Sequence, residues 1–422
     1  MKLWAGAIGL AGIASAAIQI GSKPPTDTYV VFLTGNEQGH LAPCGCSFPM
    51  TGGAKRRASA IERLGSKGRN IILESSDLVS GTGRQDEIKL ETFAQLNRAM
   101  DGTAISFGYA ESRLGPGQAN SMAQLSGGRA LNSGMSPNNP YGIKSEIRRG
   151  PFLIGSVSMQ SEALQNRIGE QVLTWREAVA NLVRVAGEEK RHLFLMIDGS
   201  LEDARKIQSS FPEIALIQYK SNGHPSDRIV RQGATVLATN GDGGKDLLRM
   251  TWSDGAFTSY VPISLEPAFK DEVVAARLYR GYLKRVNSED LLSKVEKVQN
   301  DLFVGSSKCG KCHAKSLSVW KKSKHSHGLE TLEREGHDRD PDCVSCHVTG
   351  LDSTHGFVSR VKTPDLASIG CESCHGPGSK HTASPKLFRL PKAGPKACLS
   401  CHRLENSPKF NFAAYWAKIR HK

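Results

Sequence analysis

One five-residue pattern, Cys-x-x-Cys-His, occurs four times near the end of the chain and constrains the fold more than any other feature. The four copies are Cys309, Cys312 and His313; Cys343, Cys346 and His347; Cys371, Cys374 and His375; and Cys398, Cys401 and His402. Two thiols at this spacing can add to the two vinyl groups of one haem, and the adjacent histidine then ligates the iron. Zinc sites or disulfides would use the cysteine pairs but leave the four histidines unexplained. The motifs therefore predict four c-type haems, with these histidines as proximal iron ligands.

Composition restricts the second axial ligand of each iron. All eight methionines lie at or before Met250, so Met/His ligation, which raises the potential of many cytochromes c, is not expected here. The distal ligands must then be histidines or be absent. We predict His325, His327, His381 and His421 as distal ligands, and we expect His337 and His355 to be surface residues. The stretch from Trp320 to His327 is expected to lie on a helix, where the side chains of His325 and His327, two residues apart, diverge and could serve different haems.

The haem-binding segment, residues 303–422, leaves about 30 residues for each haem, too few for a separate apolar core. We therefore expect a mostly α-helical domain whose core is formed by the haems. Residues 301–422 contain 20 Lys and Arg against 11 Asp and Glu, a surplus that eight haem propionates would nearly neutralise. The net charge of +14 for the whole chain is for this reason no argument for nucleic-acid binding.

The first residues have the features of an export signal. Lys2 precedes an uncharged run from Leu3 to Ile20, and Ala14-Ser15-Ala16 has the form that signal peptidase accepts. We interpret residues 1–22 as a cleaved signal peptide, with an uncleaved membrane anchor as the alternative. Export agrees with c-type haem attachment and predicts a periplasmic protein, bound to the inner membrane only if the segment is retained.

Residues 28–266 alternate between strand-like and helical patterns, which predicts a layered α/β domain. The expected strands are Tyr29–Leu33, Asn70–Leu73, Thr103–Phe107, Phe152–Ser156, His192–Met196, Ala215–Gln218 and Thr235–Ala238, followed by a hairpin from Met250 to Ile263. Helices are expected at Gly52–Leu64 and Trp175–Val185. A connector, residues 267–302, has apolar residues at helical spacing and predicts one or two amphipathic helices.

The segment from Phe32 to Leu64, with Gly52-Gly53-Ala54-Lys55-Arg56, resembles the opening of the calcineurin-like metallophosphoesterases, in particular the periplasmic 5′-nucleotidases. The later motifs of that family correspond to Leu73–Asp77, Phe107–Glu111, Gly223-His224 and Asn240–Lys245. This resemblance implies the phosphoesterase fold for residues 28–266.

The sequence departs from that family at the metal ligands. The first Asp-x-His is replaced by Asn36-Glu37-Gln38-Gly39-His40, and the expected Asn-His pair reads Tyr109-Ala110. Asp198 follows the strand after which the family has a histidine. Only His40, Asp77 and His224 remain, too few for a two-metal centre with ions about 3.5 to 4 Å apart. We therefore expect a degenerate domain without hydrolase activity, and an active metal-dependent phosphoesterase is the least favoured function.

Cys44 and Cys46 lie in the loop after His40, where the active site of the family would be. They could form a strained disulfide in an oxidising compartment or remain inert thiols. Alternatively, Cys44, Cys46 and His40 could form a redox site or bind a soft metal, since thiolates prefer such metals.

The C-terminal domain resembles the multihaem cytochrome c-554 family. The resemblance is carried by Val304-Gly305, Trp320–His325, Cys346–Gly350, Cys371–Gly376 and His381. It implies a tetrahaem electron-transfer module, in which some relatives leave one iron five-coordinate, and the whole chain resembles bacterial fusions of a 5′-nucleotidase-like domain to such a cytochrome. We predict an electron carrier that exchanges electrons with periplasmic or membrane-bound redox proteins and does not bind nucleic acid. The alternative is a multihaem oxidoreductase with substrate chemistry at an open haem or at Cys44 and Cys46.

Overall fold

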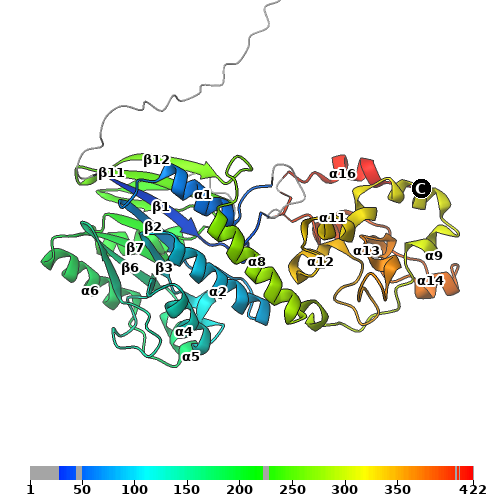
Figure 1. The fold of residues 1–422 in the computed structure, drawn as a ribbon, viewed down its shortest axis with the longest axis horizontal. Helices are drawn as coiled ribbons and strands as arrows, with labels where there is room; N and C mark the ends of the chain where they lie inside the picture. The colour runs from blue at the N-terminus through cyan, green and yellow to red at the C-terminus, as the bar shows by residue number, and fades with distance from the viewer. Residues whose placement is uncertain (1–27, 44–49, 222–227, 404–405, 408, 422) are drawn as a thin grey trace, which may run out of the picture.

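The computed structural model describes residues 28–43, 50–221, 228–403, 406–407 and 409–421. It contains a larger α/β part, formed by the N-terminal two thirds of the chain, and a smaller helical part, with helix α8 (Val273–Ser288) running towards the latter (Figure 1). The proposed signal segment, Cys44, Cys46 and His224 lie outside the described residues.

Two six-stranded sheets form the centre of the α/β part. The first sheet has the order β12-β11-β1-β2-β3-β4 and the second β5-β6-β7-β8-β10-β9. The strands of the first sheet are β1 (Tyr29–Gly35), β2 (Asn70–Ser75), β3 (Thr103–Ser106), β4 (Ala130–Leu131), β11 (Asp246–Ser253) and β12 (Ala256–Ser264). Those of the second are β5 (Glu146–Arg149), β6 (Phe152–Ser158), β7 (His192–Asp198), β8 (Leu216–Gln218), β9 (Ile229–Gln232) and β10 (Thr235–Ala238). Both sheets have parallel central strands and antiparallel pairs at an edge.

Side chains alternate between the two faces of each strand, which gives the domain its layers. In β1, Val31 and Leu33 belong to the core between the two sheets, whereas Val30 and Phe32 belong to the core under the helices of the first sheet. Both faces are apolar because both are covered. The helices of this part are α1 (Ala54–Leu64), α2 (Arg84–Ala99), α3 (Tyr109–Ser112), α4 (Pro116–Leu125), α5 (Ser161–Ile168), α6 (Trp175–Glu188) and α7 (Leu201–Ser210). Helices α1, α2, α4 and α8 contribute to the first outer core, and α6 and α7 pack on the second sheet. The predicted layered α/β fold is confirmed.

The connector contacts both parts of the molecule. Helix α8 is followed by a 3-10 turn, η1 (Leu291–Lys294). Leu291 belongs to the core of the α/β part, whereas its neighbour Leu292 belongs to the core of the helical part. Val298 then forms a β-bridge with Ser353, so the end of the connector is already bound to the helical part.

The helical part consists of short helices and 3-10 turns. They are α9 (Ser306–Gly310), α10 (Ala314–Lys321), η2 (Lys324–His327), α11 (Gly328–Glu335), α12 (Pro341–His347), η3 (Pro364–Leu366), α13 (Cys371–His375), α14 (Ser379–Ala383), α15 (Pro395–Leu399) and α16 (Phe412–Ile419). The prediction of a mostly helical C-terminal part is confirmed. The prediction that His325 and His327 lie on the helix of Trp320 is wrong: α10 ends at Lys321, and both histidines lie on η2.

The buried apolar core of the helical part is small. It comprises Leu292, Leu329, Leu332, Val344, Val348, Leu351, Phe357, Leu366 and Ala367. Large apolar side chains elsewhere in this part are exposed, including Val361, Leu387 and Leu399. A protein core of this size leaves the motif-bearing segments to be covered by another apolar group. No helix within the described ranges is long and apolar enough to cross a membrane.

Candidate functional site

Three of the four motif histidines face a second histidine from a distant part of the sequence. The ring centroids are 6.2 Å apart for His313 and His381, 6.3 Å for His402 and His325, and 6.0 Å for His375 and His421. The planes of these pairs are inclined by 23°, 47° and 57°, respectively. A metal bound to two imidazoles through bonds of about 2 Å places their ring centroids about 6 Å apart. The spacing of all three pairs therefore fits an iron between the rings.

Hydrogen bonds at Nδ1 orient several of these rings. Nδ1 lies 2.8 Å from Gly328 O in His347, 2.9 Å from Pro391 O in His375, 2.7 Å from Phe388 O in His381, and 3.0 Å from Ile419 O in His421. A carbonyl oxygen can only accept, so Nδ1 carries the hydrogen and Nε2 keeps a free lone pair. Metal-ligating histidines are commonly held in this way.

His347 differs from the other motif histidines. Across the described part of the chain, no second imidazole lies opposite its ring at the spacing of the three pairs. Because Nδ1 of His347 donates to Gly328 O, Nε2 would be the atom that holds a haem iron. The arrangement therefore distinguishes the second motif as a candidate open site.

Three of the four predicted distal histidines, His325, His381 and His421, face motif histidines, whereas His327 does not. His327 Nδ1 lies 2.8 Å from Glu330 Oε2 on the exposed surface. Because η2 turns the side chains of His325 and His327 in different directions, only His325 faces the domain interior. His337 is hydrogen-bonded to Tyr279 at 3.3 Å, and His355 is exposed.

The thiols of different motifs are close to one another. A hydrogen bond from Cys309 lowers the pKa of Cys371 to about 6, and one from Cys401 lowers that of Cys346 to about 6. Helix α13, which carries the third motif, contacts both α9 and α15, which carry cysteines of the first and fourth motifs. The four motifs thus follow the spatial order first, third, fourth, second.

A buried carboxylate links the first and third motifs. Glu372, between the two cysteines of the third motif, accepts hydrogen bonds from Val304 N at 2.9 Å, Gly305 N at 2.8 Å and Gly378 N at 2.7 Å. Gly305, which precedes α9, has a φ of 83°, a backbone conformation that glycine adopts readily. Its amide can therefore reach the Glu372 carboxylate.

Three features of the helical part fit c-type haem: the paired imidazoles, the unbridged thiols among the described cysteines, and the small apolar core.

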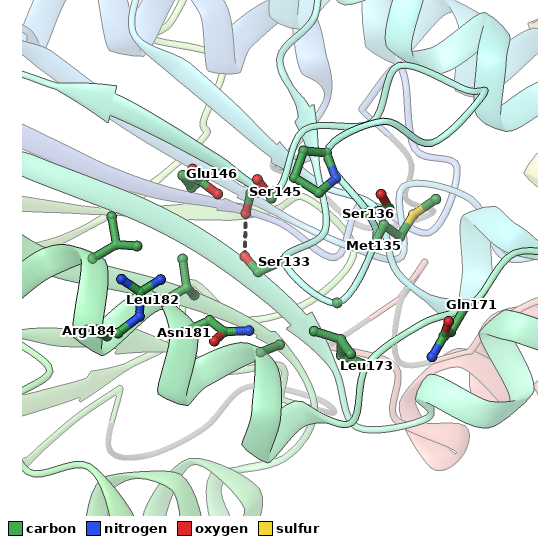
Figure 2. A pocket seen from close by; sticks show the side chains of 14 residues that line it. Ser133, Met135, Ser136, Ser145, Glu146, Gln171, Leu173, Asn181, Leu182 and Arg184 are labelled. Atoms are coloured by element: carbon green, nitrogen blue, oxygen red, sulfur yellow. Dashed lines mark hydrogen bonds between the residues drawn. The ribbon is translucent and has the colours of Figure 1, made fainter.

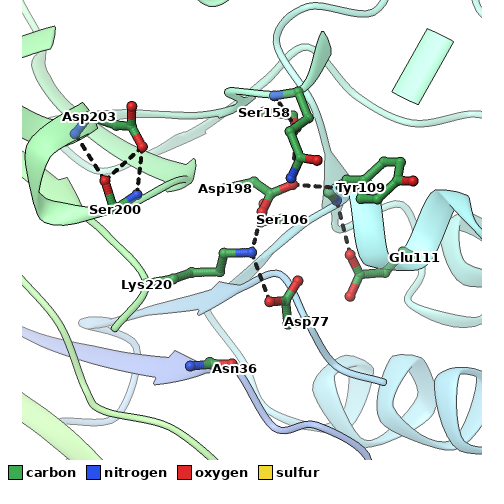
Figure 3. A network of polar contacts seen from close by, with 12 residues as sticks. Asn36, Asp77, Ser106, Tyr109, Glu111, Ser158, Asp198, Ser200, Asp203 and Lys220 are labelled. Atoms are coloured by element: carbon green, nitrogen blue, oxygen red, sulfur yellow. Dashed lines mark hydrogen bonds and ion pairs between the residues drawn. The ribbon is translucent and has the colours of Figure 1, made fainter. Parts of the chain in front are cut away.

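The second candidate site lies at the carboxyl ends of the parallel strands of the α/β part. Asp77 follows β2, Asp198 ends β7 and Lys220 follows β8. Lys220 Nζ is 2.8 Å from Asp77 Oδ2 and also forms an ion pair with Asp198 Oδ1 (Figure 3). Asp198 Oδ2 accepts further hydrogen bonds from Tyr109 N at 2.7 Å and Ser158 Oγ at 3.0 Å. The ammonium of Lys220 therefore lies between two carboxylates of the site.

Lys220 is the cation that pairs with both carboxylates of this network. Burial alone would lower the pKa of Lys220, but the carboxylates of Asp198 and Asp77 outweigh it and raise the pKa above its ordinary value. Asp198 is 2% exposed, and the Lys220 ammonium is its ion-pair partner. Lys220 is a site residue that the sequence analysis missed; its position directly after a strand was the available signal.

The remaining phosphoesterase positions do not converge on a metal site. His40 Nδ1 is bonded to Glu37 O at 3.0 Å, and burial lowers its pKa. Asn36 donates to Ser221 O at 3.0 Å, and Glu37 forms a buried ion pair with Arg57. Among the described residues, no group of three or more His, Cys, Asp or Glu side chains could hold a metal ion. The described residues at these positions do not by themselves fit a two-metal centre.

Two of the cavities that described residues form lie in the α/β part. One of about 290 Å³ is lined by Asp77, Asp198, Lys220 and Arg113 of the degenerate site, among others. A larger one of about 410 Å³ lies between α6 and the segment around Ser133, which donates to Ser145 O at 2.5 Å (Figure 2). The lining of the larger cavity contains no nucleophile paired with a base, so its size does not indicate catalysis.

Comparison with known proteins agrees with the two parts of the structure. Residues 308–376 match the family model described as "Cytochrome c554 and c-prime". The chain is 33% identical over 113 residues to cytochrome c-554 of Nitrosomonas europaea, a match that covers 22% of this chain and 47% of the relative. The chain thus spans about half the length of that curated relative. The solved reduced cytochrome c554 of the same organism is 28% identical, with a TM-score of 0.22 over 24% of this chain and 66% of that chain.

The α/β part is similar to the solved NAD nucleotidase of Haemophilus influenzae. The TM-score is 0.53 at 10% identity, and the match covers 67% of this chain and 64% of that chain. At this identity the likeness concerns the fold alone. The two resemblances seen in the sequence are confirmed: a 5′-nucleotidase-like fold precedes a helical region similar to cytochrome c-554.

Proposed function

We propose that this protein is an exported tetrahaem c-type cytochrome that carries electrons between other redox proteins. The observation that carries the proposal is the set of three histidine pairs at iron-binding distance, each including a motif histidine. Bound haem would supply one-electron chemistry at iron. The chain itself supplies thiols for attachment, imidazoles for ligation, and carbonyl groups that orient those imidazoles.

The proposed ligand sets follow from the pairs. The first haem would have His313 and His381, the third His375 and His421, and the fourth His402 and His325. The second would have His347 alone among the histidines. His327 is left out of the proposed set because it is paired with Glu330 at the surface.

The contacts between thiols of different motifs support close packing of the four attachment sites. Their order makes the first and second sites the two ends of a chain of neighbours. Electrons could then enter at one end and leave at the other. The proposed partners are periplasmic or membrane-bound redox proteins, and only basic patches that remain after the haem propionates are counted could steer an acidic partner.

A second function, substrate binding at the second haem, is favoured by the unpaired His347. A haem held by His347 could bind small molecules, because no second imidazole among the described residues faces that histidine. The α/β part would not act as a phosphoesterase, because Lys220 lies where two site carboxylates meet. Its proposed role is to hold the cytochrome part and to present it to partners.

Two measurements on the exported, haem-loaded protein test the proposal. Mass spectrometry under denaturing conditions should find four covalently bound haems. Electron paramagnetic resonance of the oxidised protein should find three low-spin irons and one high-spin iron. Fewer than four haems would contradict the tetrahaem assignment, and an entirely low-spin spectrum would contradict the open position at His347.

Carbon monoxide separates the carrier from the enzyme. Addition to the reduced protein should change the spectrum of one haem, and nitrite or hydroxylamine can then be tested as substrates. If the single open haem binds carbon monoxide but no substrate is turned over, the carrier function stands alone. If no haem responds, chemistry at the second haem is excluded.

A further inference from the structure

The α/β part contacts the helical part at the helix that carries the second motif. Helices α2 and α8 pack side by side and extend towards α12 (Figure 1). Gln85 and Lys89 lie one turn apart on α2, so their side chains project from the same face. Tyr282 of α8 projects into the same region, where it is hydrogen-bonded to Gln85 at 2.8 Å.

Hydrogen bonds from these helices reach the residue that caps α12. Gln85 Nε2 donates to Asp340 Oδ1 at 2.7 Å, and Tyr282 OH donates to Asp340 Oδ2 at 2.9 Å. Asp340 in turn accepts a hydrogen bond from Asp342 N at 3.1 Å, which caps the helix. With 5% exposure, Asp340 is a buried carboxylate whose partners come from both parts of the molecule.

An ion pair lies beside these hydrogen bonds. Lys89 of α2 pairs with Asp342, the residue immediately before Cys343. The Lys89 side chain is 7% exposed, whereas that of Asp342 is 58% exposed. Burial would lower the pKa of Lys89, but the carboxylates of Asp342, Asp340 and Asp86 outweigh it, so the lysine is charged. A charge with so little solvent around it acts over longer distances than a surface charge.

Asp342 is five residues from His347, and a helix rises about 1.5 Å per residue, so about 8 Å of helix separates them. Both charges of the pair are therefore close to the second attachment site. A positive charge near an iron favours the ferrous state and raises its potential, whereas a negative charge lowers it.

We propose that the α/β part sets the redox potential of the haem attached at Cys343 and Cys346, through the Lys89–Asp342 ion pair and the Gln85 and Tyr282 contacts with Asp340. This inference rests on the proposed tetrahaem function and gives the degenerate α/β part a specific role. Lys89 and Asp342 are positioning residues in this scheme: they touch neither the iron nor a substrate. Separation of the two parts would expose Asp340 and leave both Asp residues without their cation, which couples docking to the potential of one haem.

The test is the midpoint potential of the high-spin haem in full-length holoprotein, followed by electron paramagnetic resonance during redox titration. Lys89→Met should shift that potential downward and Asp342→Asn should shift it upward. The double variant should lie between the two single variants. Arg84→Met is the matched control on the same helix, because Arg84 pairs with Glu87 and Glu289 and not with the helical part. It should leave the potential unchanged.

The opposite signs distinguish an electrostatic role from a structural one. Loss of packing would move both single variants in the same direction, and that result would overturn the inference, as would potentials equal to that of the wild type. Should Lys89→Met fail to fold, Tyr282→Phe keeps the ring and removes one hydrogen bond to Asp340, and it should also lower the potential. Failure of the proposed function is seen separately, as missing haems or a missing high-spin signal in the wild type.

Discussion

The imidazole of His381 lies opposite that of His313, with ring centroids 6.2 Å apart and planes inclined by 23°. The two residues come from α14 and from the turn after α9. The hydrogen bond from His381 Nδ1 to Phe388 O leaves Nε2 of His381 available to a metal ion, and the spacing of the two rings fits such an ion between them.

Replacement of His381 by alanine should convert the first haem from low spin to high spin, because one axial ligand is lost. The oxidised protein should then show two high-spin irons instead of one in electron paramagnetic resonance. His327→Ala is the control, since His327 is paired with Glu330 at the surface. A second high-spin iron in His327→Ala, or none added in His381→Ala, would contradict the proposed ligand sets.

Replacement of Lys220 by alanine should destabilise the α/β part by about 3 kcal/mol, because it leaves the buried carboxylate of Asp198 without its cation. Denaturant unfolding monitored by far-ultraviolet circular dichroism measures the loss. Arg184→Ala, which breaks an exposed pair with Glu188, should cost about 0.5 kcal/mol or less.

The same variant tests whether the Lys220 ammonium, which lies between Asp77 and Asp198, takes the place of a metal ion. The wild-type unfolding curve should be the same with Mn²⁺ and with a chelator, whereas Mn²⁺ should restore part of the stability lost in Lys220→Ala. A wild-type protein that is strongly stabilised by Mn²⁺ would show that the degenerate site binds metal in spite of the lysine.

The buried carboxyl group of Glu111 should make the α/β part less stable as the pH rises. Burial, followed by the charge of Asp77, raises the pKa of Glu111 from 4.5 to about 7. Between these two values the folded state holds a proton that the unfolded state has lost, so the free energy of unfolding falls with increasing pH. The contribution of protonated Glu111 to the free energy of unfolding is complete below pH 4.5 and is lost as the pH rises through about 7.

Unfolding of Glu111→Gln at pH 5 and pH 7 measures this contribution. The variant should lose less stability between the two pH values than the wild type does. Its absolute stability will also change, because Glu111 accepts hydrogen bonds from Leu78 N at 2.8 Å and Gly108 N at 3.1 Å. Glu62→Gln, on the exposed surface of α1, is the control and should lose as much stability between pH 5 and pH 7 as the wild type does. If Glu111→Gln also lost as much as the wild type, Glu111 would not be the source of this pH dependence.

Leu291→Ala and Leu292→Ala should destabilise different parts of the molecule. The two leucines are 5% and 6% exposed and belong to separate cores. Each truncation should cost about 2 to 5 kcal/mol. Hydrogen exchange should show faster opening of the α/β part in Leu291→Ala and of the helical part in Leu292→Ala. Identical exchange patterns in the two variants would mean that the cores unfold as one unit.

The sequence alone predicted the features that depend on local spacing. Cys309, Cys312 and His313 can be interpreted together because attachment and proximal ligation involve residues within one turn of chain. The strands predicted around Val31 and Leu193 also follow from local patterns, since a strand buried on both faces is a continuous apolar run. The absence of methionine from the last part of the chain restricted the distal ligands to histidine.

Tertiary structure decided which distant residues meet. His325 and His327 lie on the same 3-10 turn, and the geometry of that turn decides which of them faces a motif histidine. The partner of His325 is His402, which is far along the chain, so local sequence could not identify the pair. Likewise Lys220 meets Asp77 only because parallel strands bring their carboxyl ends to one edge of the fold. Lys89 meets Asp342 because α2 and α8 dock against α12. Such contacts arise from the packing of elements and not from residue spacing, so the sequence could name the chemistry of the four motifs but not the partners that complete and adjust it.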